Sequence, residues 1–481
     1  MNILFVVQDL GFEQLGIMML SAMLKKSGHK VSTVRARYSD IKRKLINNNS
    51  TVLLAYSSTT LSIRDYLALN RMVKTEIDVF SVFGGSHCTL FPETINEKGV
   101  DGVCVGEGDY ALVDLANNLN EGSPITNIPN WWIKQDGQIF RNPPRPLIKN
   151  LENLPFPDRT LFANYSTISA ITTRGCSYGC SYCCARSELR CRSVDSVIEE
   201  LKEAKDKTRA RFVVFWDLTF NVATAWLKEF SEKYKKDIGR SFGCSLRADL
   251  VNHERVRYLK EAGCFSIQIG LETANEYLNN HILKKRTSKK QILAAAEIIK
   301  RYGIRLVTSS LLGLPYGSLD DDFETFKLNI RLRPSLAKAN LLYVYRNTEL
   351  FDFLRADPKI SATLNNWRYG DFGFVLQSAI YNQNIRVIKN LHKLFSIAVH
   401  LPFIRPFLPF LIRLPIYPFY WCLNIIWMFS GLHFQELNEG NCLLKCKIII
   451  IDLVKGARKL FTKAMYYRKW SRLSVFLNHS D

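Results

Sequence analysis

Residues 172–183 read Thr-Thr-Arg-Gly-Cys-Ser-Tyr-Gly-Cys-Ser-Tyr-Cys, and this stretch decides how the rest of the chain is interpreted. Its cysteines, Cys176, Cys180 and Cys183, have the spacing C-x3-C-x2-C. Three thiolates so close together can bind three irons of a [4Fe–4S] cluster and leave the fourth iron without a protein ligand. An iron of this kind can bind a small molecule, whereas a fully ligated cluster mainly stores or passes electrons. The spacing therefore predicts a cluster with one open iron.

Other roles for these cysteines are disfavoured. A zinc site usually has paired C-x2-C units or added histidines, and no second unit lies nearby. Twelve cysteines in 481 residues are too sparse for a disulfide scaffold. The first residues, 1–7, have no basic segment or cleavage site and are typical of a first strand rather than a secretory signal. Cys184 and Cys191 fall outside the cluster spacing. This cysteine usage suits a reducing compartment, so we expect a cytoplasmic protein.

A predicted strand leads into the cysteine run, and similar strand patterns recur along the chain after it. Helical patterns separate the predicted strands, which suggests a partial β/α barrel over residues 166–384. The chemistry of such barrels lies at the carboxyl ends of the strands. The predicted strands are Ile168–Thr173, Phe212–Trp216, Gly243–Leu246, Ser266–Leu271, Leu306–Leu312 and Asn340–Tyr345.

Residues 1–125 also alternate strands and helices, which predicts a doubly wound, Rossmann-like parallel sheet. The predicted strands are Ile3–Val7, Lys30–Val34, Val52–Tyr56, Val79–Phe83 and Gly102–Val105, and the helices between them include Gln14–Lys26, Ile63–Lys74 and Tyr110–Leu119. Ligands of such sheets bind beyond the carboxyl ends of the strands. No G-x-G-x-x-G follows the first strand, which disfavours a dinucleotide site.

Residues 126–165 form the predicted linker between the two domains. Seven prolines occur in residues 124–165, and Asp136-Gly137 indicates a small hairpin.

Residues 385–481 are predicted to be a helical, hydrophobic and basic C-terminal region. Residues 414–435 contain no Asp, Glu, Lys or Arg, and their single histidine is taken as neutral. Prolines interrupt this segment, so we expect it to lie in a membrane interface, with Trp421 and Trp427 as anchors. A spanning segment and a buried helical pair are the alternatives.

The chain carries a formal net charge of +21, from 65 basic and 44 acidic residues. Such an excess suggests nucleic acid, anionic substrates or an anionic membrane surface as partner. No nucleic-acid-binding motif accompanies it, so no nucleic acid is expected. We expect instead a peripheral position at the inner face of the membrane.

Several motifs resemble those of radical S-adenosylmethionine (SAM) enzymes that carry a cobalamin-binding domain. In the radical domain these are the cysteine run, with Tyr182 before its last cysteine, the strand end at Gly270-Leu271-Glu272 and Leu312-Gly313-Leu314-Pro315. In the N-terminal domain they are residues 84–93 and 106–108. The resemblance implies a [4Fe–4S] cluster whose open iron chelates SAM. It also implies SAM contacts from Tyr182, Asp217, Arg247, Glu272 and Leu314.

The same resemblance implies cobalamin at the N-terminal sheet. The D-x-H-x-x-G motif that supplies a lower axial histidine is absent, so no histidine ligand is expected from the first loop. The implied cobalamin contacts are Gln8, Asp9, Leu10, Ser58, Thr59, Gly84, Gly85, Ser86, His87, Gly106 and Glu107.

The reaction implied by the family is reductive cleavage of SAM to a 5′-deoxyadenosyl radical, followed by cobalamin-dependent methylation of an unactivated carbon. An external electron donor and a small-molecule or lipid-like substrate are the expected partners. Cyclisation or rearrangement without methyl transfer is the enzymatic alternative, and a membrane-docked cluster or cobalamin sensor is the non-enzymatic one. A methylthiotransferase is disfavoured because the N-terminal domain has only Cys88 and Cys104. Departures from the family at Tyr316 and Arg346 leave the substrate open.

Overall fold

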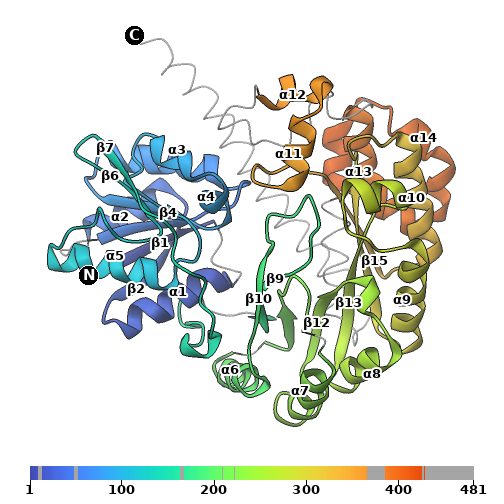
Figure 1. Ribbon diagram of the computed structural model, residues 1–481, viewed down its shortest axis with the longest axis horizontal. Coiled ribbons are helices and arrows are strands. Elements are labelled where there is room, and N and C mark those ends of the chain that lie inside the picture. The colour runs from blue at the N-terminus through green and yellow to red at the C-terminus, as the bar shows by residue number, and fades with distance from the viewer. Residues whose placement is uncertain are drawn as a thin grey trace.

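The computed structural model describes residues 1–8, 13–47, 52–162, 167–208, 210–221, 223–365, 385–424 and 427. Figure 1 shows two α/β units side by side, the N-terminal domain in blue and the central domain in green and yellow. The predicted fold class, a Rossmann-like domain followed by a partial β/α barrel and a helical region, is confirmed.

The N-terminal domain is built on a parallel sheet, as its alternating pattern predicts. The seven-stranded sheet has the order β2-β1-β3-β4-β5-β6-β7. Its parallel strands are β1 (Asn2–Val7), β2 (Lys30–Arg35), β3 (Val52–Ser57), β4 (Phe80–Gly84) and β5 (Gly102–Cys104). Alternate side chains of β1 face opposite sides, so Phe5 packs with α1 (Leu15–Lys26) and α5 (Asp109–Glu121). Val6 packs on the other side with α2 (Tyr38–Ile46) and α3 (Ile63–Lys74).

The hairpin that we placed in the linker belongs to the N-terminal sheet. Strands β6 (Trp131–Gln135) and β7 (Gln138–Arg141) add to β5 in antiparallel fashion. The Trp131 indole is fully buried and donates a hydrogen bond to the carbonyl oxygen of Ala111, 2.7 Å away. The sheet of the first domain thus reaches residue 141 rather than ending before 125. Short helices α4 (Ser86–Leu90), η1 (Pro92–Asn96) and η2 (Leu151–Asn153) complete this part of the chain.

The central domain is a parallel sheet of six strands in the order β15-β14-β13-β12-β11-β8. The order leaves the barrel open between β8 and β15. The strands are β8 (Thr167–Ala170), β11 (Phe212–Phe215), β12 (Ser241–Leu246), β13 (Cys264–Glu272), β14 (Arg305–Leu312) and β15 (Leu336–Leu341). The helices are α6 (Val194–Lys207), α7 (Thr224–Asp237), α8 (His253–Glu261), α9 (Lys289–Arg301) and α10 (Leu319–Leu332), with short helices η3 (Ala248–Leu250) and η4 (Leu278–Ile282).

Two predicted strands are wrong in their limits. The predicted strand Ile168–Thr173 divides into β8 and β9 (Thr173–Cys176), because the chain turns out of the sheet at Ile171 and Thr172. Strand β9 then pairs with β10 (Ser187–Cys191) in a separate antiparallel ribbon. The last strand ends at Leu341 instead of running from Asn340 to Tyr345. The β-forming residues after Leu341 leave the sheet and bury Leu342 and Val344 in a neighbouring apolar cluster.

Helices at the C-terminal side cover β15. They are α11 (Glu349–Arg355), α12 (Pro358–Asn365), α13 (Ile385–His400), η5 (Pro402–Phe407) and α14 (Leu408–Leu411). The apolar side of α13 packs in one cluster with residues of α10 and β15. Within the described part of the chain, no helix is both long enough and apolar enough to cross a bilayer. The described portion of segment 414–435 includes Asn424 and Trp427, whose side chains donate hydrogen bonds to Lys393 and Ser396 of α13.

Candidate cofactor-binding site

Cys176 ends β9, and Cys180 and Cys183 lie on the loop between β9 and β10, the strands that Figure 1 shows between the two sheets. Gly175 has a φ of +85°, and a Cβ at this position would overlap the carbonyl oxygen of Glu188 on β10. Glycine is therefore required just before Cys176. Inside the loop, the Ser181 hydroxyl donates to the Ile282 carbonyl oxygen at 2.5 Å, and its N–H donates to that of Leu283 at 2.9 Å. These bonds fix the loop against the barrel.

Cys176, Cys180 and Cys183 are free, half-buried thiols. Burial raises the pKa of Cys183, and the neighbouring cysteines raise it further. Among the described residues, no three His, Cys, Asp or Glu side chains are already arranged as a metal-binding group. The donor set nevertheless suits an iron–sulfur cluster, because three soft thiol donors from one short loop can converge by side-chain rotation.

Tyr182 and Glu272 meet beside the cysteine loop, as their assignment to one site predicts. Glu272 ends β13 with a φ of +60°, an uncommon conformation for a non-glycine residue. Its carboxylate is buried and accepts a hydrogen bond from Lys285 at 2.5 Å. Burial, and next the charge and hydrogen bond of Glu272, raise the pKa of Tyr182. Sequence reasoning missed Lys285, which follows no motif and reaches Glu272 only through the fold.

Arg247 also lies beside the loop, with Nη1 3.7 Å from the sulfur of Cys180 and its guanidinium 4.0 Å from the centre of the Tyr178 ring. Two of its nitrogens are already paired with Asp249, at 3.0 and 3.1 Å. Arg247 therefore already binds a carboxylate within the chain. A contact between Arg247 and SAM stays a prediction.

Asp217 follows β11 and is almost completely buried. Its Oδ1 accepts hydrogen bonds at 2.7–2.9 Å from the N–H and hydroxyl groups of Thr172 and Thr173. This cluster of donors explains why the chain turns between β8 and β9. The other oxygen, Oδ2, has no hydrogen-bond partner among the described residues. A buried, unpaired carboxylate oxygen suits a cationic ligand group, which fits the predicted contact with the amino group of SAM.

Leu314 is buried next to the end of β14, in the segment expected on the adenine side of SAM. The preceding Gly313 has a φ of +67°, and its N–H donates to both oxygens of Asp322 at 3.1 and 3.3 Å. These bonds fix the turn that presents Leu314. Its contact with SAM stays a prediction.

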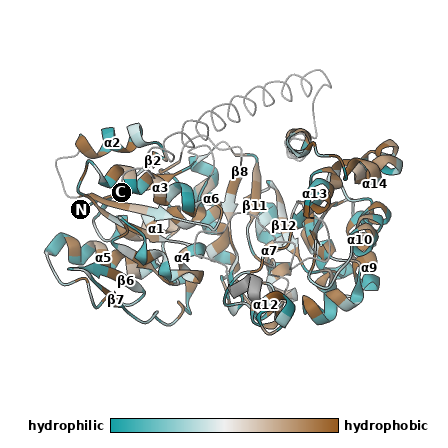
Figure 2. Cartoon of the chain, turned by 90° about the horizontal axis from the view of Figure 1, so that it is seen from above, coloured by the Kyte–Doolittle hydropathy of each residue, from teal (hydrophilic) through white to brown (hydrophobic). Residues whose placement is uncertain are grey.

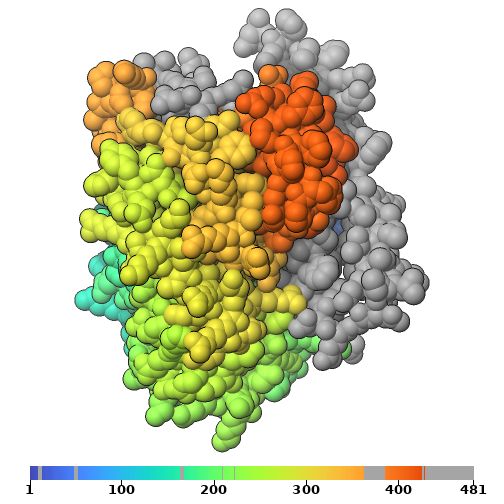
Figure 3. Space-filling view, turned by 90° about the vertical axis from the view of Figure 1, so that its right-hand side faces the viewer, coloured from blue at the N-terminus to red at the C-terminus, as the bar shows by residue number. Residues whose placement is uncertain are grey.

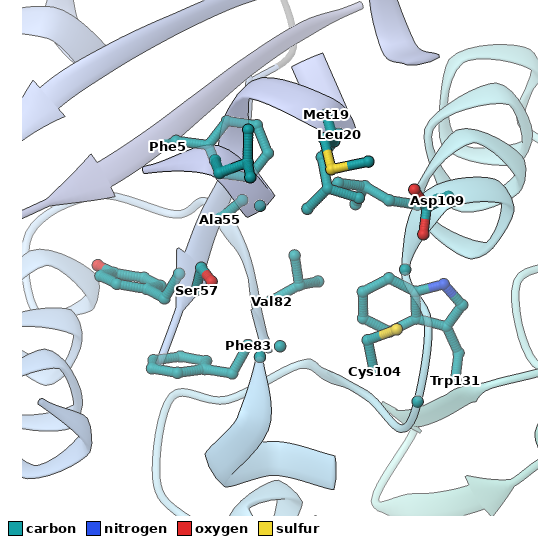
Figure 4. A pocket seen from close by; sticks show the side chains of 18 of the residues that line it. Phe5, Met19, Leu20, Ala55, Ser57, Val82, Phe83, Cys104, Asp109 and Trp131 are labelled. Carbon is teal, nitrogen blue, oxygen red and sulfur yellow. The ribbon is translucent and has the colours of Figure 1, made fainter. Parts of the chain in front are cut away.

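A cavity of about 320 Å³ opens at the carboxyl edge of the N-terminal sheet. Figure 4 shows mostly apolar side chains around it, with Met19 and Leu20 from α1 and Cys104 and Trp131 from β5 and β6. The predicted residues Gly84, Gly85 and Gly106 are among those that line it. The α1 residues and Trp131 were missed, because a helix that faces a ligand has the same apolar pattern as one that faces a core.

The loops that follow β3 and β4 pack closely against each other at one side of this cavity. Gly85 has a φ of +91°, and a Cβ there would lie 2.6 Å from the Ser58 carbonyl oxygen. The Ser58 hydroxyl donates to the Gly84 carbonyl oxygen at 2.9 Å. The Thr59 N–H donates to the Ser62 hydroxyl oxygen at 2.9 Å, and Ser86 begins α4. These contacts support the backbone rather than present side chains to the cavity.

His87 and Glu107 are placed differently from the lining residues. His87 is completely buried, 3.3 Å from the Thr60 hydroxyl and stacked on Phe91, and burial lowers its pKa to about 4. Glu107 accepts hydrogen bonds from Arg190 and from the N–H of Ile148. For these two residues, as for the exposed Gln8, cobalamin contact stays a prediction. Asp9 and Leu10 lie outside the described residues.

Charged residues join this cavity to the cysteine loop. Arg174, two residues before Cys176, donates to both carboxylate oxygens of Asp109 at 2.9 and 3.0 Å. Both Arg174 and Asp109 line the cavity, as does Ile171. Glu107 pairs with Arg190 of β10 at 2.9 Å. Opposite charges on separate domains were visible in the sequence, but only the fold shows which of them meet.

Comparison with known proteins agrees with this division. The family model of the radical SAM superfamily matches residues 170–328, and that of the B12 binding domain matches residues 3–116. An uncharacterized methyltransferase of Pyrococcus horikoshii is 27% identical over 374 residues, covering 74% of this chain and 80% of its own. A putative methylthiotransferase of Methanocaldococcus jannaschii is 23% identical over 382 residues, 74% of this chain and 81% of its own. The hopanoid C-3 methylase of Methylococcus capsulatus is 23% identical over 341 residues, 66% of this chain and 64% of its own.

Among solved structures, the radical SAM methyltransferase TsrM from Kitasatospora setae, with cobalamin and a [4Fe–4S] cluster bound, has a TM-score of 0.63. It is 15% identical and covers 74% of this chain and 76% of its own, a likeness that shows a shared fold. The two matched domains imply SAM, a [4Fe–4S] cluster and cobalamin as the cofactors of the chain. With both domains in one chain, and with the cysteine loop next to a cavity in the B12 domain, the chain belongs to the radical SAM enzymes that carry a cobalamin-binding domain.

Proposed function

We propose that the protein is a cobalamin-dependent radical SAM C-methyltransferase. The observation that carries this proposal is the wall shared by the two sites. Ile171 and Arg174, which lead into Cys176, also line the cavity of the B12 domain. A corrin at that cavity and a cluster on that loop would therefore be neighbours, as transfer of a methyl group to a nearby substrate radical requires.

When bound, these cofactors supply reductive cleavage of SAM, with an electron from an external donor, and a methyl group for transfer. The protein supplies position and exclusion of water. Cys176, Cys180 and Cys183 would hold the cluster, and Asp217 Oδ2 would accept a hydrogen bond from the SAM amino group. The buried Glu272 carboxylate accepts a hydrogen bond from Lys285 and lies near the partly buried Tyr182, which brings the loop and the end of β13 together. The apolar cavity would take a flat aromatic part of the corrinoid.

For the substrate we propose an apolar, lipid-like molecule. Trp216 and Leu218 follow β11 and expose 64% and 51% of their surface at the carboxyl end of the barrel. Large apolar side chains exposed at that end, where barrel enzymes carry their chemistry, suit an apolar substrate. The similarity to a hopanoid methylase is a further, weaker support. Peripheral membrane association would give the enzyme access to such a substrate.

A radical cyclisation or rearrangement is the second candidate. It would use the same cysteine loop, and it is favoured by one observation: the segment after β15, in which the ring centres of Tyr343 and Tyr345 are 4.5 Å apart, departs from the family motif at Arg346. The product separates the two candidates, because methylation adds the methyl group of SAM and rearrangement does not.

The test is anaerobic reconstitution of the full chain with iron, sulfide, cobalamin and SAM. We expect a bound corrinoid spectrum and release of 5′-deoxyadenosine on reduction. Cys180→Ala should abolish SAM cleavage and leave the corrinoid bound. Cys184→Ala, its matched control one residue beyond the motif, should retain both. SAM cleavage by the Cys180→Ala protein, or the lack of any corrinoid in the reconstituted wild type, would contradict the proposal.

A further inference from the structure

A second cavity, of about 690 Å³, lies far from the cofactor loops, on the helical side of the central domain. It is formed by the last turns of α9 and α10 and by the turn from α13 into η5. Figure 3 shows α13 and the short helices after it, in red-orange, side by side with the yellow-orange atoms of α10. We call this cavity the basic cavity because five of its lining residues are basic: Lys300, Arg331, Arg333, His400 and Arg405.

The charge of the basic cavity is not neutralised by the described part of the protein. No Asp or Glu lines the cavity, and no ion pair involves its four Lys and Arg residues there. Lys300 and Arg405 each use some of their donors on helix carbonyl oxygens, Leu332 for the first and Ala398 and Val399 for the second. Arg331 and Arg333 are exposed. The cavity therefore has free donors and a strong positive potential, which suits a phosphate group.

Arg333 stands where a helix normally places another residue type. It is the residue after α10 and has a φ of +46°. Glycine or asparagine usually occupies this left-handed position, because a side chain with a Cβ is strained there. The cation is thus placed in the cavity at a cost in local conformational energy.

Exposed aromatic rings stand beside the basic cavity. Phe403, Phe407 and Phe410, which we call the aromatic ridge, expose 70%, 62% and 64% of their surface. The ridge and Arg405 belong to the same short segment, η5 and α14. Figure 2 places α14 at the end of the molecule opposite the N-terminal domain. Exposed phenylalanines next to unneutralised cations are the surface pattern of proteins that lie on a bilayer.

We propose that the basic cavity and the aromatic ridge form a docking surface for an anionic lipid bilayer, with a headgroup phosphate in the cavity and the rings at the acyl boundary. A soluble phosphate compound would use the cavity and leave the ridge exposed to water, so the bilayer explains both features. This proposal rests on the membrane association proposed above, but it assigns the anchoring to the aromatic ridge instead of Trp421 and Trp427. Trp427, predicted as an anchor, instead donates to Ser396 of α13 at 2.9 Å.

The test is co-sedimentation of the full-length protein with vesicles of phosphatidylcholine, with and without about one third phosphatidylglycerol, in low salt. We expect binding to the anionic vesicles only. Arg331→Gln with Arg333→Asn should weaken it about thirty-fold, because each cation near an anionic surface contributes about one kcal/mol. Both substitutions spare the two cations that cap helices. Lys235→Gln with Lys236→Gln, which removes two exposed charges from the last turn of α7, should weaken binding far less.

Phe403→Ser with Phe407→Ser should abolish the binding that remains in high salt, since apolar insertion is not screened. Equal binding by the wild type and the arginine variant would overturn the proposal. So would protection from heat by inorganic phosphate without any vesicle binding, which would assign the cavity to a soluble anion. SAM cleavage by each variant is measured in parallel, without lipid. Lost vesicle binding with normal SAM cleavage is the expected result, so a failed docking surface is distinguishable from a failed enzyme assignment.

Discussion

Asp322 is a buried carboxyl group in the first turns of α10, and its titration is a test of the structure at the residue scale. Burial raises its pKa to about 7, against the opposing hydrogen bond from the Gly313 N–H. The folded protein therefore binds a proton at pH values where the unfolded chain, with an ordinary Asp near 3.8, has released it. The stability contributed by this group is complete below about pH 4 and is lost as pH rises to about 7.

The change Asp322→Asn should remove this pH dependence while it keeps an acceptor for Gly313. The free energy of unfolding of the variant minus that of the wild type should increase as the pH rises from 4 to 7, by at most about 1.4 kcal/mol per pH unit. Urea unfolding at pH 5, 6, 7 and 8 measures it. Asp320→Asn controls for the loss of one negative charge in the same turn. A difference that stays constant over this range would contradict the buried position of Asp322.

At the scale of elements, the hairpin β6–β7 tests how the N-terminal sheet and its cavity are joined. Trp131 is buried, lines the cavity and donates to Ala111 of α5. Trp132, the next residue, is half-buried on the opposite face, and the guanidinium carbon of Arg141 lies over its ring, 5.3 Å from the ring centre. Two tryptophans in one strand therefore differ in burial and in access to the cavity.

Trp131→Ala should lower the free energy of unfolding by about 3–5 kcal/mol, because it leaves a void and removes the buried hydrogen bond to Ala111. It should also reduce the amount of corrinoid retained after reconstitution. Trp132→Ala, the matched control, should cost less and keep the corrinoid. Urea unfolding gives the first quantity, and the absorbance of the bound corrinoid after gel filtration gives the second. Equal effects of the two substitutions would show that the cavity is not bounded by Trp131.

At the scale of the whole molecule, a buried ion-pair network ties the parts together. Arg159 of the linker pairs with Glu13, which precedes α1, at 2.7 Å and with Glu200 of α6 at 2.8 Å. All three side chains are almost fully buried. Glu13 also accepts the Ser169 N–H of β8 at 2.5 Å. The network thus links the N-terminal domain, the linker and the barrel.

Glu200→Gln should destabilise the protein by about 3–5 kcal/mol, since it leaves the buried Arg192 without its carboxylate partner and Arg159 with Glu13 alone. The two domains should then unfold in separate steps instead of together, which differential scanning calorimetry detects. The control is Glu203→Gln on the same helix, which removes an exposed pair with Lys207 and should cost about 1 kcal/mol or less. A single unfolding transition in the Glu200→Gln protein would show that other contacts couple the domains.

The sequence alone determined the two α/β units and the cysteine loop, because both rest on local signals. Alternating strand and helix patterns need no tertiary contact to be recognised, and nine of the eleven predicted strands overlap an observed strand along most of their length. The cysteine spacing is local too. Of the two exceptions, Ile168–Thr173 divides where the chain turns at Asp217, and Asn340–Tyr345 has strong β propensity but leaves the sheet because packing buries Leu342 and Val344.

Only the tertiary structure decided which distant residues meet. Lys285 reaches Glu272, Arg174 reaches Asp109, and Trp131 closes the cavity, through contacts that no periodicity encodes. The predicted contact of Glu107 with cobalamin stays a prediction, and only the fold shows that its carboxylate pairs with Arg190 across the domains. A charged side chain takes the partner that burial brings near it, since an unpaired charge in the interior is costly. Partners of this kind are fixed only when the domains pack.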